Sequence, residues 1–414
     1  MSNTSLFKSK YYPWILVGLL SVVAMLNYMD RQMIATMRPS MQIDIDELKQ
    51  AANFGRLMAV VLWVYGLMSS LSGMIADRFN RKWLIVGSLF VWSGVTLAMG
   101  FAKTYDELYV LRALMGFSEA LYIPAGLSLI ADYHSDKTRS LAIGLHMTGI
   151  YLGQAFGGFG SVVSAAMSWQ ITFIIFGGIG MLYAVVLLFF VQEKTSNDND
   201  VITIKKSSTS FKEDIKGLGK LFSSFSFWII ILYFAVPSLP GWAIKNWAPT
   251  LFSETLGIDM KKAGPLATIS ISLSSLLGVV VGGILSDKWV QRNIRGRVYT
   301  GAIGLSLTIP ALLLLGFGHT LTHFMGAAFL FGFGFGMFDT NNMPILCQFV
   351  DLRQRATAYG FLNTAGICLG AVITDFLGKS TDAGNLGRDF AMLALVVFAV
   401  LLLQLGFLRP VNKT

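Results

Sequence analysis

Long apolar stretches alternate with short polar ones along almost the whole chain, from Trp14 to Leu408. Each apolar stretch is close to the roughly 20 residues that a helix needs to cross the hydrocarbon core of a bilayer. The pattern therefore predicts an all-α membrane protein with twelve transmembrane helices. The predicted spans are 13–36, 55–75, 83–101, 106–131, 140–163, 168–191, 226–253, 263–285, 298–317, 320–344, 355–378 and 388–408.

One long polar stretch, from Gln192 to Ser224, interrupts this pattern between the sixth and seventh spans. It predicts an N-terminal six-helix bundle at 1–191, a cytoplasmic linker at 192–225 and a C-terminal six-helix bundle at 226–414. Within the linker, Phe211 to Leu221 carries apolar residues at helical spacing with lysines between them. This is typical of an amphipathic helix at the membrane surface, although a plain solvated linker accounts for it as well.

The composition supports a location in lipid. Hydrophobic residues make up 54% of the 414 residues, charged residues make up 13%, and the mean hydropathy is +0.62. A water-soluble protein of this size needs more polar surface than that. There are two cysteines, Cys368 inside a predicted span and Cys347 just beyond the end of one, so a disulfide or metal framework is not expected and no cofactor is predicted.

The positions of the cations predict the orientation of the chain. Residues at the first two positions of a span are counted with the gap before it. Of the 32 Lys and Arg residues, 21 then fall in the termini and even-numbered gaps, 8 in odd-numbered gaps and 3 inside spans. Positive loops stay in the cytoplasm, so both termini are predicted to be cytoplasmic. The short loops favour a bacterial inner membrane. Nucleic-acid binding is not expected, because no soluble basic face with interleaved aromatic residues is present.

A charged loop is repeated in the two halves of the chain. Gly73-Met-Ile-Ala-Asp77-Arg78-Phe-Asn-Arg81-Lys82 is echoed 210 residues later by Gly283-Ile-Leu-Ser-Asp287-Lys288-Trp-Val-Gln-Arg292. Internal repeats with a substrate site between them are found in transporters that work by alternating access. The repeat predicts pseudo-symmetric halves.

The first copy of this loop resembles the hallmark loop of the major facilitator superfamily, and the resemblance extends over the whole chain. It implies the fold of that superfamily and a monomer. It also implies a conformational gate, in which Asp77, Arg78 and Arg81 hold the outward-open state. Together with the repeated copy, the predicted gate residues are Gly73, Asp77, Arg78, Arg81, Asp287 and Arg292. A simple positive cap on the cytoplasmic side is the alternative.

Charged residues lie deep inside the first and fourth predicted spans: Asp30 and Arg31 in the first, and Arg112 and Glu119 in the fourth. A charge at the centre of a bilayer costs about 2.5 to 3.5 kcal/mol or more, so such residues face the protein interior and usually have a function. Arg112 and Glu119 are seven residues apart, which places them on one face of a helix. The four residues are therefore predicted to share one site.

These residue types permit the coupled binding of an anion and a proton. Arginine stays charged and matches a carboxylate or phosphate in bidentate fashion. A carboxylate in a poorly hydrated site holds its proton more firmly, whereas a neighbouring arginine has the opposite effect. An anion that draws Arg31 or Arg112 away from Asp30 or Glu119 would let the freed carboxylate take up a proton. The competing interpretation is that the four residues form fixed structural ion pairs.

The pattern Asn27-Tyr28-Met-Asp30-Arg31, together with Arg112 and Glu119-Ala120, resembles the anion:cation symporter branch of the superfamily. This resemblance implies that Arg31 and Arg112 bind an organic anion such as a sugar acid, and that Asp30 and Glu119 bind protons. The same segments also resemble Spinster-like lipid transporters, which stay open as the alternative. Further predicted substrate-binding residues are polar or aromatic and lie in spans one, five, seven and ten: Asn27, Tyr28, Tyr151, Gln154, Lys245, Asn246, Asn341 and Asn342.

The sequence thus predicts a secondary active transporter, with a small organic anion, protons and the lipid bilayer as its partners. Proton-coupled symport is the preferred mode. A Spinster-like lysolipid transporter and a proton-coupled efflux antiporter are the alternatives. An enzyme is not expected, because the sequence shows no metal-ligand cluster and no phosphate-binding loop. A substrate sensor on a transporter fold is a further alternative.

Overall fold

The computed structural model describes residues 9–135, 138–193, 223, 225–350 and 355–408, and these residues are helical with no strand among them. The predicted amphipathic helix at 211–221 and most of the predicted linker lie outside the described residues. The division of the chain at 191/192 and 225/226 therefore stays a prediction. All twelve predicted spans are helical over most of their length, which confirms the all-α prediction.

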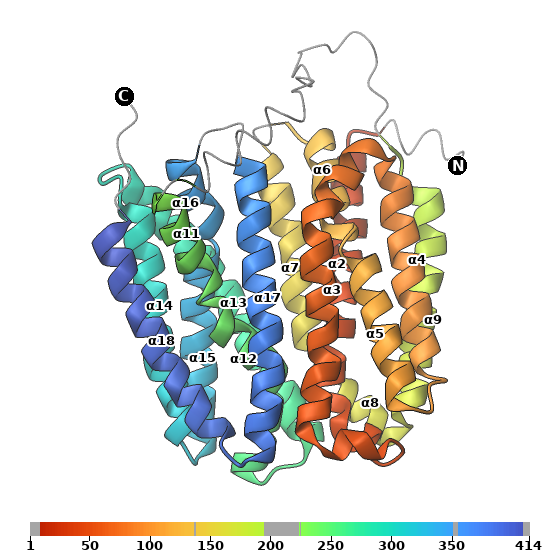
Figure 1. The fold of residues 1–414 in the computed structure, drawn as a ribbon. Helices are drawn as coiled ribbons and strands as arrows, with labels where there is room; N and C mark the ends of the chain where they lie inside the picture. The colour runs from red at the N-terminus through yellow and green to blue at the C-terminus, as the bar shows by residue number, and fades with distance from the viewer. Residues whose placement is uncertain (1–8, 136–137, 194–222, 224, 351–354, 409–414) are drawn as a thin grey trace.

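The first six predicted spans form one group of helices, drawn from red to yellow-green in Figure 1. Its elements are α2 (Tyr12–Met41), the short 3-10 helix η1 (Asp46–Lys49), α3 (Ala51–Arg78), α4 (Arg81–Met99), α5 (Tyr105–Glu119), α6 (Tyr122–Tyr133), α7 (Arg139–Gly157), α8 (Gly160–Ala166) and α9 (Trp169–Phe190). The last six spans form the second group, drawn from green to blue. Its elements are α11 (Phe225–Ala235), α12 (Ser238–Leu256), α13 (Met260–Val290), α14 (Gly296–Phe317), α15 (Leu321–Asp339), α16 (Asn342–Phe349), α17 (Arg355–Asp382) and α18 (Leu386–Phe407).

The two groups lie side by side and pack along two seams. One seam joins α3 to α17, and the other joins α7 to α13 (Figure 1). α2 begins and α18 ends at the upper end of the bundle in Figure 1, which we call the terminal end, and the opposite end is called the far end. The predicted arrangement of two six-helix halves is confirmed, and the site between them is formed by helices of both.

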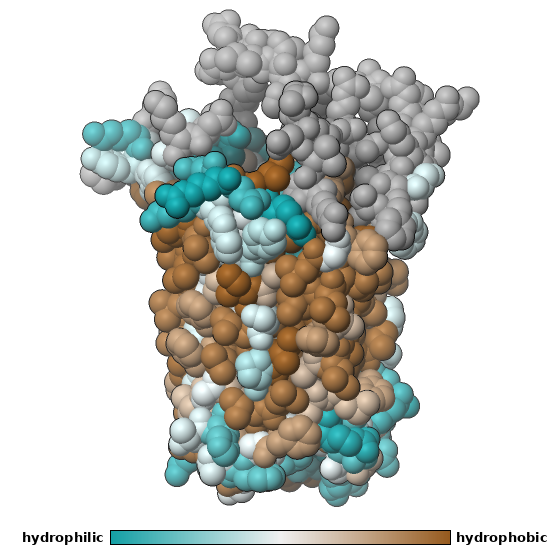
Figure 2. Space-filling view, turned by 90° about the vertical axis from the view of Figure 1, so that its left-hand side faces the viewer, coloured by the Kyte–Doolittle hydropathy of each residue, from teal (hydrophilic) through white to brown (hydrophobic). Residues whose placement is uncertain are grey.

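The outside of the bundle is suited to lipid. Figure 2 shows a broad hydrophobic band on one face, with hydrophilic residues gathered above and below it. Large apolar side chains such as Leu182, Leu395 and Phe407 are exposed. In a protein surrounded by water such a surface would be a liability. Among the described residues, eleven helical segments are long and apolar enough to cross a membrane. α7, which covers most of the predicted fifth span, is less apolar.

Prolines break three of the predicted spans into two helices. Pro124, Pro240 and Pro344 each lack the N–H that would bond to the carbonyl four residues earlier, and each ring would clash with that carbonyl. The breaks fall where this rule places them, between α5 and α6, between α11 and α12, and between α15 and α16. The break in the seventh span agrees with the run of prolines there. The fourth and tenth predicted spans are each found as one long apolar segment, and each is divided into two helices near its proline.

Glycines bring α7 against α2 within the N-terminal half. A Cβ atom on Gly149 would collide with the carbonyl oxygen of Ser21, and one on Gly153 would collide with that of Met25. Gly157 continues this line of contact toward the far end. Small residues allow such backbone contact between membrane helices. The close approach holds α2 in place, and α2 carries two of the four predicted membrane charges.

Candidate functional site

A buried ion pair joins α2 to α5 in the middle of the N-terminal half. The Nε atom of Arg31 donates to Oε2 of Glu119 at 2.5 Å, and the two side chains are 9% and 0% exposed. The Arg31 guanidinium lies over the ring of Tyr65 from α3, 4.2 Å from its centroid, and over Tyr28 at 5.3 Å. Cation–π contacts are strongest where water is excluded. The structure therefore brings Arg31 and Glu119 together, as the sequence predicts.

Both partners of this pair keep one free hydrogen-bonding atom. Among the described residues, Nη2 of Arg31 and Oε1 of Glu119 are buried without a partner. A buried polar atom without a partner is costly, and a charged pair is stable inside a protein only if its remaining donors and acceptors are satisfied. The pair is thus incompletely satisfied, and a ligand with both donors and acceptors would improve it.

Asp30 and Arg112 lie behind this pair and are 5% and 2% exposed. The Thr96 hydroxyl from α4 donates to Oδ2 of Asp30 at 3.3 Å. Arg112 donates through Nε to the Leu57 carbonyl at 3.5 Å and through Nη1 to the sulfur of Met115 at 3.3 Å. Asp30 and Arg112 interact electrostatically with each other and with Glu119. All four predicted charges thus form one electrostatic cluster, within which Arg31 and Glu119 make the direct contact.

The break of the fourth span explains where Glu119 lies. α5 ends at Glu119, which is its fifteenth residue, and the whole span from Tyr105 to Tyr133 has 29 residues. The acid therefore stands halfway along the span, at the end of a helix. The backbone N–H of Ala120 closes this last turn by donating to Gly116. The end of a helix carries partial negative charge, which favours the approach of the cation Arg31.

A second cation, Lys245, lies in the C-terminal half on α12. Its ammonium group lies 4.9 Å from the ring centroid of Trp242. Pro249 has no N–H with which to bond the Lys245 carbonyl, and Nε2 of Gln32 on α2 donates to that carbonyl instead, at 2.7 Å. This hydrogen bond crosses between the two halves. The broken seventh span therefore places Lys245 beside the N-terminal half, where a substrate site is predicted.

The remaining predicted substrate residues divide into three groups. Tyr151 and Gln154 lie on α7, where Tyr151 is half-buried and Gln154 is buried. Asn246 is instead occupied in helix packing, since its Nδ2 donates to the Thr374 hydroxyl at 2.8 Å. Three buried asparagines have an amide atom without a partner among the described residues: Asn27 through Nδ2, and Asn341 and Asn342 through Oδ1.

Asp339 is a site residue that the sequence-based set does not contain. It ends α15 halfway along the tenth span and accepts from Nδ2 of Asn342 at 3.2 Å. Its side chain is exposed, although it lies halfway along a predicted span. The sequence carries a signal for it, which is an acid five residues before a proline.

The predicted gate residues make contacts within their own halves, where they are described. Arg81 pairs with Asp132, which joins α4 to α6. Asp287 accepts from Nη2 of Arg297 at 3.3 Å, and Arg292 is exposed. The side chains of Gly73, Asp77 and Arg78 lie outside the described residues. Their predicted role in gating stays a prediction.

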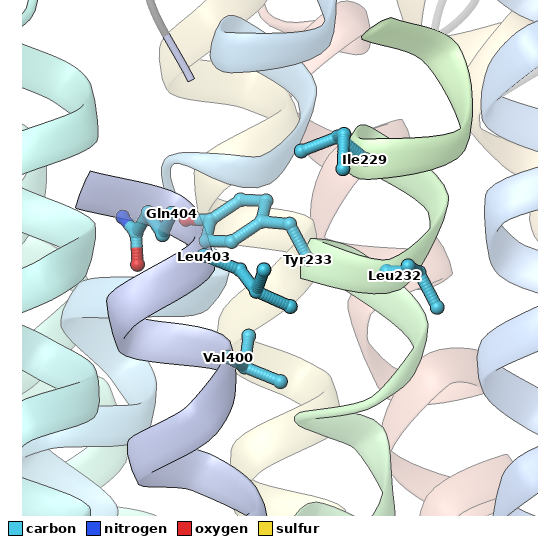
Figure 3. A pocket seen from close by; sticks show the side chains of 6 residues that line it. All are labelled: Ile229, Leu232, Tyr233, Val400, Leu403 and Gln404. Carbon is cyan, nitrogen blue, oxygen red and sulfur yellow. The ribbon is translucent and has the colours of Figure 1, made fainter. Parts of the chain in front are cut away.

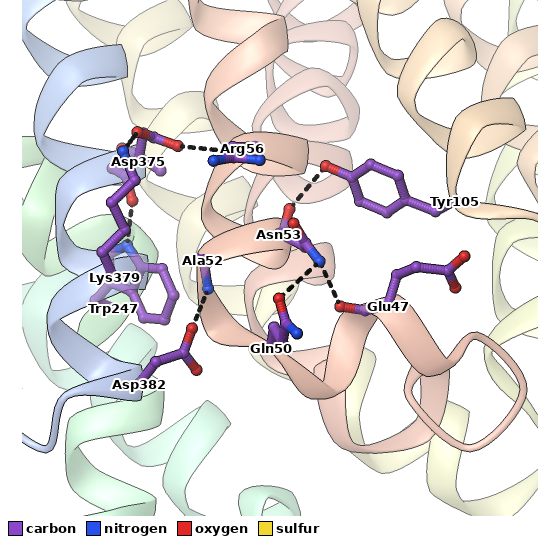
Figure 4. Close-up of polar contacts among 11 residues, drawn as sticks. Glu47, Gln50, Ala52, Asn53, Arg56, Tyr105, Trp247, Asp375, Lys379 and Asp382 are labelled. Atoms are coloured by element: carbon purple, nitrogen blue, oxygen red, sulfur yellow. Dashed lines mark hydrogen bonds and ion pairs between the residues drawn. The ribbon is translucent and has the colours of Figure 1, made fainter.

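Charged residues join the two halves at the far end (Figure 4). The Asp382 carboxylate at the end of α17 accepts from the backbone N–H groups of Ala51 and Ala52 at 2.7 and 2.9 Å. These are the first two residues of α3, where N–H groups have no partner inside the helix. Beside this contact, Arg56 pairs with Asp375 at 3.6 Å. No pattern in the sequence indicates this contact, because its partners are more than 300 residues apart.

A small recess between α11 and α18 has a different character (Figure 3). Its lining is mainly apolar, with Tyr233 and Gln404 as the polar members. The amide of Gln404 donates to the Val298 carbonyl at 2.7 Å. No charged side chain lines this recess, so it offers no counter-charge for an anion.

Comparison with known proteins gives the wider context. A sequence profile described as Major Facilitator Superfamily matches residues 20–374. The hexuronate transporter of Bacillus subtilis (strain 168) is 25% identical over 411 residues, which cover 95% of this chain and 94% of that protein. The galacturonate transporter of Dickeya chrysanthemi is 26% identical and covers 76% of this chain and 92% of that protein.

Among solved structures, a bacterial homologue of the human lysosomal transporter Spinster, in an inward-facing and occupied conformation, has the same fold. The TM-score is 0.78 at 20% identity, and the alignment covers 98% of each chain.

Proposed function

Because this chain belongs to the Major Facilitator Superfamily and is a secondary transporter and not an enzyme, we propose that it carries a small organic anion together with a proton. In this proposal Arg31 and Arg112 attract the anion, and Glu119 and Asp30 exchange protons. The chain works as a monomer in a bacterial inner membrane, with both termini in the cytoplasm. The two predicted bundles, 1–191 and 226–414, move about the site between them.

The observation that carries this proposal is the incompletely satisfied pair of Arg31 and Glu119. The pair is held by one contact of 2.5 Å, and each partner retains a free atom. A carboxylate of a substrate can take the guanidinium edge in bidentate fashion. A fixed structural pair would gain nothing from a free hydrogen-bonding atom on each partner. A pair in which Arg31 exchanges Glu119 for a substrate carboxylate requires these free atoms.

The exchange couples anion and proton through charge balance. When the substrate carboxylate binds Arg31, Glu119 loses its counter-charge in a buried place, and an unpaired buried charge is strongly destabilising. Glu119 then binds a proton and becomes neutral. One negative and one positive charge have entered, so the loaded site has the same net charge as the empty one. The relatives named as hexuronate and galacturonate transporters support a sugar acid as the anion.

Uptake into proteoliposomes tests the coupling, with labelled D-galacturonate as the probe. An inward proton gradient should drive accumulation, and a protonophore should abolish it. Glu119→Gln should keep exchange of labelled for unlabelled probe while it loses accumulation against a gradient. Arg31→Gln should lose binding. Asp46→Asn is the matched control, because Asp46 is an exposed carboxylate whose partner, Lys49, is in the same short helix.

Three results would refute the proposal. Accumulation that is unchanged by the protonophore would exclude proton coupling. Loss of binding and of thermal stability in both Arg31→Gln and Glu119→Gln would instead support a fixed structural pair. Transport of lysophosphatidylcholine with no transport of sugar acids would favour the Spinster-like alternative.

A further inference from the structure

A feature of the fourth span returns in the tenth span. Gly116, Glu119 and Pro124 stand in the pattern glycine, two residues, acid, four residues, proline, and Gly336, Asp339 and Pro344 repeat this spacing 220 residues later. Both copies have the same local structure. Each acid is the last residue of a helix, and the following N–H, of Ala120 or Thr340, bonds back to the glycine carbonyl. Asp339 is therefore the structural counterpart of Glu119.

The cation of the pair is repeated as well. Arg31 lies three residues after Tyr28 and packs over its ring, and Lys245 lies three residues after Trp242 and packs over its ring. Each cation belongs to the first span of its half. The charges of Lys245 and Asp339 attract each other. The C-terminal half thus holds its own cation, ring and carboxylate in the arrangement of the N-terminal half.

The two copies differ in one respect. The cation and the carboxylate are in direct contact in the first copy and are not in the second. Arg31 and Glu119 are in contact and buried. Among the described residues, Lys245 and Asp339 have no ion pair within 4.0 Å, and Asp339 is exposed. Lys245 lies beside the N-terminal half, because its backbone carbonyl accepts a hydrogen bond from Gln32 of α2.

We infer that Lys245 and Asp339 form a second pair that holds the substrate, with Lys245 binding the same carboxylate as Arg31 and Asp339 accepting a hydrogen bond from a hydroxyl group of the same molecule. This inference rests on the proposed function in one respect, because it takes the cargo to be an organic anion. It adds that Asp339 recognises a hydroxyl group of that anion, and it assigns this recognition to the C-terminal half.

Charge and hydrogen bonding explain why a hydroxyl group is required. An ionised carboxylate has only acceptors. A substrate without donors that takes Lys245 would leave Asp339 facing a second anion, with the Asn342 amide as its donor. A hydroxyl beside the substrate carboxylate supplies a further donor. A site built to bond a hydroxyl discriminates strongly against an analogue that lacks it.

Calorimetric titration of the purified full-length protein tests this inference. The probes are D-galacturonate, D-gluconate and tetrahydropyran-2-carboxylate, which keeps the ring and carboxylate of galacturonate without its hydroxyls. The wild type should bind the two sugar acids about ten- to hundredfold more tightly than the third probe, as expected when a polar group loses its partner. Asp339→Asn should reduce this ratio to about threefold or less. Lys245→Gln should lose binding of all three, and Lys245→Arg should retain it.

Asp46→Asn and Lys49→Gln are matched controls, because this pair is exposed at the far end. Each variant is first checked by gel filtration and thermal unfolding, and Asp339→Ser replaces Asp339→Asn if the latter does not fold. Wild-type discrimination in the Asp339 variant, or wild-type affinity in Lys245→Gln, would overturn the inference. Equal binding of all three probes by the wild type would overturn it and leave the proposed function standing. A wild type that binds none of them would overturn both.

Discussion

The contact of Asp382 with α3 allows a sharp test of how the far end is held closed. Asp382→Ala removes the two hydrogen bonds to Ala51 and Ala52, at 2.7 and 2.9 Å, which join one half to the other. Loss of a carboxylate cap at a helix start costs about 1 kcal/mol, and loss of its charge near the helix dipole about 0.3 to 1 kcal/mol more. A total of about 1.5 kcal/mol corresponds to about a tenfold shift. The ratio of open to closed far ends should therefore rise about tenfold.

Spin labels on both sides of the far end can measure this ratio. Ile43 follows α2, Lys261 is the second residue of α13, and both are exposed. Cysteines at these two positions, in a chain without Cys347 and Cys368, give a distance distribution by pulsed electron resonance. Asp382→Ala should increase the long-distance fraction, whereas the control Asp46→Ala should not. An unchanged distribution for Asp382→Ala would refute the idea that this cap stabilises the closed far end.

Three more outcomes follow from the packing. Gly149→Val should lower the unfolding free energy by about 1 to 3 kcal/mol, because its Cβ would meet the Ser21 carbonyl. Thermal unfolding measures this, and Gly144→Val is the control, because a Cβ atom at Gly144 would have nothing within 4 Å. Asn246→Ala should lower the unfolding free energy by about 1 kcal/mol, because the Asn246 amide donates to Thr374. Its affinity for D-galacturonate should stay within about twofold of the wild type, and a large loss of affinity with normal stability would contradict this. Arg81→Gln should change the unfolding free energy by less than about 1 kcal/mol, as is usual for an exposed pair. A larger loss in thermal unfolding would show that the pair of Arg81 and Asp132 stabilises the fold more than exposed pairs usually do.

The charge cluster is predictable from the sequence because membrane charges are few and helical spacing is regular. The cost of a charge in lipid and the period of a helix suffice to place Arg31 and Glu119 in one site, and the structure joins them. Tyr65 and Thr96, which complete the site, come from α3 and α4 and have no distinctive spacing in the sequence. Which faces of four helices meet depends on packing, and a single sequence does not encode that in any local pattern.

The helix breaks are predictable only in part. Proline disrupts a helix by the same mechanism at every position, but the outcome ranges from a kink to a complete break. Pro310, for example, lies inside the unbroken helix α14. Pro240 has Pro237 close by, and the break there agrees with the sequence. Pro124 and Pro344 stand alone in apolar runs, so their spacing does not distinguish them from Pro310.

The two acids Asp339 and Asp382 show two different limits of prediction. The place of Asp339 at a helix end follows from the break near Pro344, so an explicit treatment of that proline would have identified it. The contact of Asp382 with Ala51 is different, since no spacing rule connects residues on opposite ends of the chain. Local sequence rules can therefore predict where Asp339 lies, whereas the contact of Asp382 is visible only in the packed structure.

The seam of glycines between α2 and α7 bears on leakage. A carrier driven by an ion gradient wastes that gradient whenever ions slip through unaccompanied, and a file of water molecules is the usual path for stray protons. At Gly149, Gly153 and Gly157 the two helices approach so closely that even one added methyl group would collide with α2. No chain of water molecules can form along that line. In the proposed proton-coupled transporter, stray protons would therefore have to take a route other than this seam.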